Sequence, residues 1–109
     1  MSNCKLPGYT VLHSSGDAEI KAKRSRFIAR IIPVNNEDQA KEAIKDMEKQ
    51  YYDSRHVCYA WICGVRQEQI MHSSDAGEPS GSAGEPILGV LKKQNLTNAI
   101  AIVVRYFGG

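Results

Sequence analysis

Apolar and polar positions near the start of the chain alternate with a period of two, which is typical of half-buried β-strands. The alternation covers residues 9–13 and 18–24, which are separated by a Ser-Ser-Gly-Asp stretch at 14–17. This pattern predicts a β-hairpin whose turn lies at 14–17. Residues 27–34 indicate a third strand. Pro33 near its end favours an edge or terminal position, because proline cannot donate a ladder hydrogen bond.

The period then changes to that of an amphipathic helix that begins after Asn36. Asn36 and Gln39 match a capping box, and Glu37 and Asp38 would lie in the electropositive first turn. The apolar positions that recur at helical spacing are Ala40, Ala43, Ile44, Met47 and Tyr51.

Short apolar runs and turn signals alternate in the second half of the chain. Residues 57–65 are apolar on both faces, which predicts a buried strand, and residues 69–72 would pair back with it. Residues 99–106 are almost continuously apolar and predict a central strand. A short helix between them is indicated by Ile87, Val90 and Leu91. The order β-β-β-α-β-β-α-β predicts an α+β fold, with two helices on one face of a mixed, mainly antiparallel sheet.

The composition is that of an ordinary water-soluble domain. The 109 residues suffice for one domain with a modest core, and 42% hydrophobic with 24% charged residues is typical of such domains. No apolar run approaches the roughly 20 residues that span a bilayer, and the N-terminus lacks a secretory signal, so we expect a cytoplasmic protein. Three cysteines, an odd count, fit a reducing compartment. Because Gly108 and Gly109 directly follow a predicted buried strand, we expect residues 1–109 to be a single domain truncated at its C-terminus.

Basic residues are concentrated in one short segment, although the net charge of the chain is only +2. No acidic residue occurs from Lys21 through Asn36. A basic strand on an open sheet face could contact phosphates, or it could be a solvated edge strand that its charge protects from aggregation. The basic residues concerned are Lys21, Lys23, Arg24, Arg26 and Arg30.

The segment 73–86, SSDAGEPSGSAGEP, is rich in glycine, serine and acidic residues. It lacks both glycine-rich phosphate-binding patterns, and its three carboxylates would repel a phosphate, so we expect no nucleotide there. Ser82 and Glu85 match a capping box for the helix that follows. Asp75 and Glu78 could hold Mg²⁺ or act as acid and base, or they could belong to a fixed turn.

A parallel β-α-β unit over residues 69–106 would place the ends of its two strands at the same edge of the sheet. Arg105 would then lie next to the 73–86 segment, where it could pair with Asp75 or Glu78. Tyr106 and Gly108 would lie at the same edge. We therefore expect the segment to form a rigid turn that displays its acids beside Arg105.

The remaining reactive side chains form no recognisable catalytic or metal-binding pattern. Cys58 and Cys63 would point to opposite faces of one strand, and His56 with Cys58 supplies only half a metal site. Ser80, His56 and Asp75, or Cys58 and His72, could be combined into a catalytic set, but no nucleophile motif brings either set together. The cysteines are therefore expected to be structural, with no metal ion or cofactor.

Four motifs occur in order along the chain: SRF at 25–27, RHVCYAW at 55–61, SDAGEPSGSAGEPIL at 74–88 and VVRYFGG at 103–109. Together they resemble the family of Impact and YigZ proteins over nearly the whole chain. The resemblance implies the fold of the second domain of a small-subunit ribosomal protein, with a left-handed β-α-β unit, an exception to the usual handedness. It also implies a link to translation, because eukaryotic members restrain the amino-acid-starvation kinase by competing for its activator.

The chain departs from the family pattern at two places. The family has two consecutive acids before the glycine at position 77, whereas this chain has Asp75 followed by Ala76, so the acid pair is incomplete. The family domain also continues beyond the Gly-Gly pair with a glycine-rich segment and a helix.

From these observations we expect a non-enzymatic, translation-linked module that binds RNA (tRNA or the ribosome) or a ribosome-associated protein. The five basic residues from Lys21 to Arg30 would contact phosphates. One alternative is a protein-binding regulator of the starvation-kinase pathway that makes no RNA contact. Another is a hydrolase that uses Asp75, Glu78 and His56 around a metal ion. The binding surface implied by the family consists of Asp75, Glu78, Ser80, Arg105, Tyr106 and Gly108.

Overall fold

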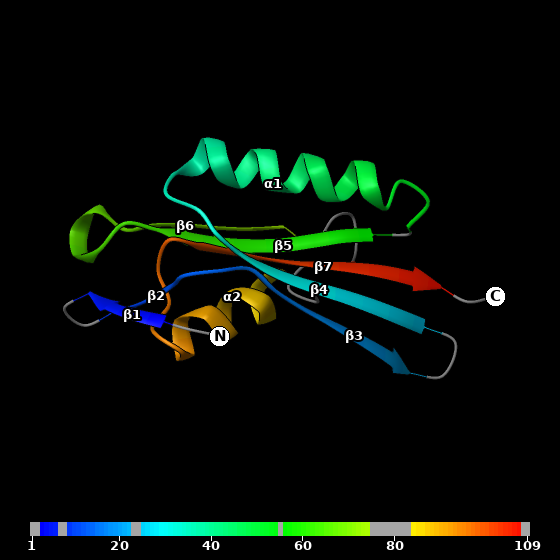
Figure 1. The fold of residues 1–109 in the computed structure, drawn as a ribbon, viewed down its shortest axis with the longest axis horizontal. Helices are drawn as coiled ribbons and strands as arrows, with labels where there is room; N and C mark the ends of the chain where they lie inside the picture. The colour runs from blue at the N-terminus through cyan, green and yellow to red at the C-terminus, as the bar shows by residue number, and fades with distance from the viewer. Residues whose placement is uncertain (1–2, 7–8, 23–24, 55, 75–83, 108–109) are drawn as a thin grey trace.

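The structure, a computed structural model, describes residues 3–6, 9–22, 25–54, 56–74 and 84–107. Two helices pack against a five-stranded sheet, and a separate two-stranded sheet lies near the N-terminus (Figure 1). The α+β class predicted from the sequence is therefore confirmed. In chain order the elements are β1 (Asn3–Leu6), β2 (Tyr9–Leu12), β3 (Gly16–Ala22), β4 (Ser25–Pro33), α1 (Glu37–Gln50), β5 (His56–Cys63), a 3-10 turn (Arg66–Glu68), β6 (Ile70–Ser74), α2 (Gly84–Lys93) and β7 (Ala99–Phe107).

The large sheet has the strand order β3-β4-β7-β5-β6, and every neighbouring pair in it is antiparallel. Strand β7 lies in the middle, as the apolar run at 99–106 predicts, and β5 pairs with β6 as the second predicted hairpin. The sheet is thus fully antiparallel rather than mixed. The one parallel bridge in the described chain joins Thr10 to Leu96, outside the named strand ladders.

The first predicted hairpin is wrong in its pairing. Strand β2 pairs with β1, and β3 pairs with β4, so residues 13–15 connect two sheets instead of two paired strands, and Gly16 and Asp17 of the predicted turn belong to β3. Two opposite-charge pairs support the β3–β4 register: Asp17 lies opposite Arg30, and Glu19 is diagonal to Arg26, which itself lies opposite Lys21. Opposite charges across an antiparallel pair stabilise that pairing.

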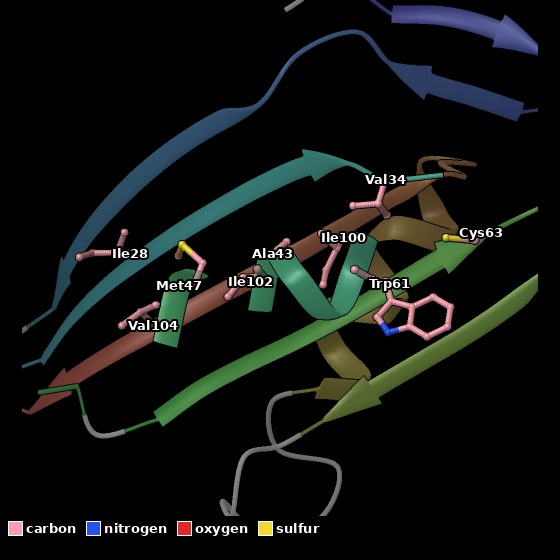
Figure 2. Close-up of a cluster of buried hydrophobic side chains, with 10 residues drawn as sticks. Ile28, Val34, Ala43, Met47, Trp61, Cys63, Ile100, Ile102 and Val104 are labelled. Atoms are coloured by element: carbon pink, nitrogen blue, oxygen red, sulfur yellow. The ribbon is translucent and has the colours of Figure 1, made fainter. Parts of the chain in front are cut away.

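The two helices cover opposite faces of the sheet, so their predicted placement on one face is wrong. Helix α1 packs on one face with Trp61, Ile100 and Ile102 among others, as Figure 2 shows. Helix α2 packs on the other face through Leu91, against Ala60 and other residues. The reason lies in β5, whose residues are apolar on both faces, because each face needs its own cover.

Each helix connects two parallel strands that flank a strand antiparallel to both. Helix α1 links β4 to β5 across β7, and α2 links β6 to β7 across β5. Figure 2 views the sheet from the α1 side: β6 runs to the left, β7 lies above it, and α2 lies behind the sheet. The β6-α2-β7 connection is therefore left-handed, as the family resemblance implies.

Helix α1 begins where its sequence predicts. The side chain of Asn36 accepts a hydrogen bond of 2.9 Å from the backbone N–H of Gln39, which satisfies one of the free donors of the first turn. The Gln39 side chain accepts in return from the N–H of Asn35, one residue earlier than in a standard capping box. Ala40, Ala43 and Met47 are the buried residues of the helix. Neither helix described here has the length and apolarity needed to cross a membrane.

Candidate functional site

The residues predicted to form binding surfaces fall into three groups. Arg26, Arg30, Arg105 and Tyr106 are described with their side chains, in β4 and β7. Lys21 belongs to β3, where only its backbone is described. The remaining predicted residues lie outside the described residues, so their roles, and the pairing of Arg105 with an acid of the 73–86 segment, stay predictions: Lys23, Arg24, Asp75, Glu78, Ser80 and Gly108.

The register between β4 and β7 places the described members on two different faces. Arg26 lies opposite Tyr106, in line with Ile28 opposite Val104, and this face is covered by α1. Arg105 is opposite Phe27 and therefore points to the α2 side, where its guanidinium lies 5.8 Å from the centre of the Phe27 ring. The structure thus separates Arg105 from Tyr106, which the sequence assigned to a single surface.

Both described arginines of the basic segment are paired with carboxylates of β3. The Nε of Arg26 lies 2.7 Å from Oε2 of Glu19, and the Nε of Arg30 lies 2.7 Å from Oδ1 of Asp17. The sequence has no acid between Lys21 and Asn36, and the acids that pair with these arginines lie on the neighbouring strand. These ion pairs reduce the positive charge that β4 offers to an outside phosphate.

Arg30 is held more firmly than Arg26. A second nitrogen of its guanidinium lies 3.2 Å from Sδ of Met47 and donates a 3.2 Å hydrogen bond to Oε1 of Gln50, both on α1. The side chain of Arg30 is only 24% exposed, compared with 49% for Arg26. Arg30 therefore fastens β4 to α1, whereas Arg26 is the more accessible of the two.

An aromatic cluster adjoins Arg26 at the C-terminal end of α1. The Arg26 guanidinium lies 5.6 Å from the centre of the Tyr106 ring, and the Tyr51 and Tyr106 rings meet edge to face at 6.3 Å. The Tyr106 hydroxyl donates a 2.9 Å hydrogen bond to Oδ1 of Asp53. Partial burial and this hydrogen bond to the Asp53 carboxylate raise the pKa of Tyr106 above its ordinary value.

Next to this cluster an open groove of about 260 Å³ lies between the β3–β4 hairpin and the end of α1, and its polar lining comes from Asp17, Glu19, Arg26, Arg30 and Tyr51. The sequence interpretation missed three of its contributors, because Tyr51 fits the apolar stripe of the helix and the two acids resemble ordinary strand or turn residues. The sequence pattern that could have identified the two acids is their spacing of two in β3, which matches arginines in β4. We name this region the Arg–Tyr surface, formed by Asp17, Glu19, Arg26, Arg30, Tyr51 and Tyr106.

On the opposite face the same strands form an apolar groove of about 250 Å³. Helix α2 packs on β5, β6 and β7, leaving the β3–β4 side of that face uncovered by a helix. The groove has small side chains at its floor and contains little to orient a polar ligand. The apolar side chains that line it are Ala18, Ala29, Ile31, Ala101 and Val103.

The 73–86 segment is anchored at both described ends. Gly84 begins α2, and a Cβ atom at this position would lie 2.8 Å from backbone atoms of Ser74, the last residue of β6. Only glycine allows this close approach without a shift of the backbone. Ser74 and Gly84 are therefore held side by side.

The described residues bring no three His, Cys, Asp or Glu side chains close enough to hold a metal ion. Cys58 and Cys63 are both buried. Burial, together with the nearby Glu37 carboxylate, raises the pKa of Cys63, which disfavours its reactive thiolate. His72 lies against the rings of Tyr59 and Trp61, at 6.0 and 5.9 Å between ring centres. His72 therefore packs on the two aromatic rings of the neighbouring strand β5.

The chain is similar to bacterial proteins about twice its length. It is 41% identical over 104 residues to the IMPACT family member YvyE of Bacillus subtilis, covering 95% of this chain and 48% of the relative. It is 38% identical over 88 residues to the IMPACT family member YigZ of Escherichia coli, covering 80% of this chain and 43% of the relative. The chain therefore spans less than half of each of these relatives.

Two solved structures share the fold. The crystal structure of a hypothetical protein matches 91% of this chain and 48% of its own length, with a TM-score of 0.87 and 33% identity. The two-domain translational regulator Yih1 matches 90% of this chain and 39% of its own length, with a TM-score of 0.68 and 24% identity.

The Impact N-terminal domain family matches residues 23–109, from the end of β3 through β7. This range includes Arg26, Arg30, Tyr51 and Tyr106 of the Arg–Tyr surface, together with the whole 73–86 segment. The match agrees with the order of motifs in the sequence and with the left-handed β6-α2-β7 unit. The chain belongs to the Impact N-terminal domain family.

Proposed function

We propose that this domain is a non-enzymatic, translation-linked regulatory module that recognises a ribosome-associated protein through its Arg–Tyr surface. The link to translation is supported by membership of the Impact family and by the likeness in fold to Yih1, which is described as a translational regulator. The observation that carries the mode of binding is the stack of Arg26 on Tyr106 beside Tyr51. Arginine and tyrosine are the residues that most often dominate protein interfaces.

The ion pairs of β3 and β4 favour a protein partner over a nucleic acid at this surface. Phosphate binding gains affinity when free Lys and Arg side chains displace counterions. Arg26 and Arg30 already have carboxylate partners at 2.7 Å, and Asp17 and Glu19 would repel a phosphate backbone. A protein with its own mixture of acids and bases is better matched to this alternating pattern.

RNA contact is the second candidate, and the basic segment is the observation that favours it. Lys21, Lys23 and Arg24 are close together in the sequence, within ten residues that carry five positive charges in total. Such a segment could contact tRNA or ribosomal RNA, and its affinity would fall steeply with added salt.

Sedimentation of the domain with purified ribosomes, and its binding to purified tRNA, distinguish these candidates. We expect ribosome binding that weakens with salt much less steeply than phosphate contacts would and is lost in Arg26→Ala and Tyr106→Ala, with no affinity for tRNA. Lys93→Ala, an exposed change at the end of α2, is the control and should bind normally. Binding to tRNA that disappears with salt and with Lys23→Ala plus Arg24→Ala would replace this proposal with the RNA candidate. Absence of binding to both would reject both.

A further inference from the structure

Tyr52 is the most exposed large hydrophobic side chain in the part of the chain that the structure describes. Its exposed fraction is 86%, compared with 61% for Val90 and 57% for Ile70. The other four tyrosines of the chain are all half-buried. A lone exposed apolar residue is ordinary on a protein surface, so exposure alone does not assign a role to Tyr52.

The position of Tyr52 places it at the border of the Arg–Tyr surface. It follows Tyr51, whose ring meets that of Tyr106 edge to face, and it precedes Asp53, whose carboxylate accepts the hydrogen bond from Tyr106. The residues on both sides of Tyr52 therefore contact Tyr106, while the Tyr52 ring itself projects into solvent. Three of the five tyrosines of the chain thus lie where the end of α1 meets β7.

The backbone that carries Tyr52 is held by hydrogen bonds on both sides. The N–H of Tyr51 donates a 2.9 Å hydrogen bond to the carbonyl of Met47, which closes the last turn of α1. The N–H of Ser54 donates a 2.9 Å hydrogen bond to the carbonyl of Tyr51, so Tyr52 and Asp53 are the two central residues of a β-turn. A side chain presented by such a turn loses little backbone freedom when it binds, which lowers the entropic cost of association.

The charges along the turn favour burial of the Tyr52 ring over stacking on a nucleic acid. The charged residues within four positions of Tyr52 carry two charges of each sign: Glu48, Lys49, Asp53 and Arg55. A base that stacks on an aromatic ring is normally held by a positively charged groove that follows the phosphate backbone. A tyrosine without such a groove gains affinity when an apolar pocket removes its ring from water and leaves the hydroxyl at the polar rim.

We propose that Tyr52 is an anchor residue of this domain, which inserts its ring into an apolar pocket of the protein partner while the Arg–Tyr surface covers the adjoining area. This inference rests on the proposed function, because it extends the Arg–Tyr surface across the turn 51–54. In this arrangement Asp53 holds the turn against Tyr106, and Tyr52 makes the contact with the partner.

Ribosome sedimentation of single variants tests the inference. Tyr52→Ala should weaken binding by roughly ten-fold or more, whereas Tyr52→Phe, which keeps the ring, should bind nearly as well as the parent domain. Because the Tyr52 side chain is largely exposed, neither change should lower the urea midpoint of the domain appreciably. Val90→Ala is the matched control: it truncates another exposed side chain, on α2 and thus on the opposite face of the sheet, and should bind normally.

Nitration of tyrosines by tetranitromethane, located by mass spectrometry, tests the unmutated domain. Tyr52 should react fastest in the free domain because of its exposure, and bound ribosomes should protect it. Unchanged nitration of Tyr52 in the bound domain would overturn the inference.

The same assays separate a failure of this inference from a failure of the proposed function. If Arg26→Ala and Tyr106→Ala lose ribosome binding while Tyr52→Ala binds like the parent domain, the anchor is rejected and the proposed function stands. A parent domain that binds no ribosomes rejects both. If Tyr52→Ala instead loses binding to tRNA, the ring stacks on bases and the protein pocket is rejected.

Discussion

The two faces of the β4–β7 pair are built from neighbouring residues but have very different environments. On the α1 side, Ile102 and Val104 are completely buried. On the other side, Ala101 and Val103 are only partly buried and line an open groove. The strand is apolar on both sides, so its composition does not create the difference. A helix covers one side of this pair, and it is this cover that turns an apolar strand face into a core.

The largest effect on stability is expected when one residue on each face of the β4–β7 pair is truncated to alanine. Ile102→Ala should lower the free energy of unfolding by about 2–5 kcal/mol, because it leaves a cavity beneath α1. Val103→Ala removes apolar atoms from an open groove that water already reaches, and it should cost about 1 kcal/mol or less. Urea unfolding of both variants measures the contrast. Equal losses would mean that the two faces are equally buried in solution.

The next test acts on the helix that covers the buried face. Asn36→Ala removes the hydrogen bond to the N–H of Gln39 and should cost about 1 kcal/mol, seen as a lower urea midpoint. Asn36→Ser, which can still cap, should retain most of the stability. If the Asn36→Ala and Asn36→Ser variants had the same urea midpoint, the side-chain cap would contribute nothing to the stability of α1.

The sequence predicted the elements better than their arrangement. The α1 boundary and the β5–β6 hairpin followed from local signals, namely a cap and a short turn between apolar runs. The side on which each helix packs did not follow, because an apolar run such as 99–106 has no polar face to orient it. The partner of β3 was also missed, because cross-strand charge pairs become visible only once the register is known.

The candidate site was only partly foreseen, for a similar reason. Arg26, Arg30 and Tyr106 were identified as members of a basic run and a family motif. Their grouping with Tyr51 depends on where the end of α1 meets the sheet, which no short motif encodes. The β-α-β unit predicts one edge for Arg105 and Tyr106 but does not say which face each side chain takes, and adjacent strand residues point to opposite faces.

A smaller effect is expected from the ion pair that joins β3 to β4. Arg30→Ala removes both the pair with Asp17 and the contact with Met47, whereas Asp17→Asn removes the charge interaction alone. Because Asp17 is 60% exposed and therefore well screened, Asp17→Asn should cost only about 0–1 kcal/mol, and less at high salt. Arg30→Ala should lower the free energy of unfolding by more, because it also removes the packing of the Arg30 side chain. Added salt should not change this packing contribution. Urea unfolding at two salt concentrations separates the two contributions.

The smallest effect concerns the ionisation of Tyr106, where two neighbours act in opposite directions. Partial burial and the Asp53 carboxylate raise the pKa of Tyr106 above its ordinary value near 10, while Arg26 lowers it. Asp53→Asn should therefore shift the pKa of Tyr106 down, and Arg26→Gln should shift it up. The raised pKa means that the contribution of Tyr106 to stability is present below pH 10 and is lost as the pH rises through its pKa in the folded protein. Ultraviolet titration of tyrosinate, taken as a difference from Tyr106→Phe, isolates this residue from the other tyrosines. Shifts of the same sign in both variants would show that Arg26 and Asp53 do not both adjoin Tyr106 in solution, and the Arg–Tyr surface would have to be redrawn.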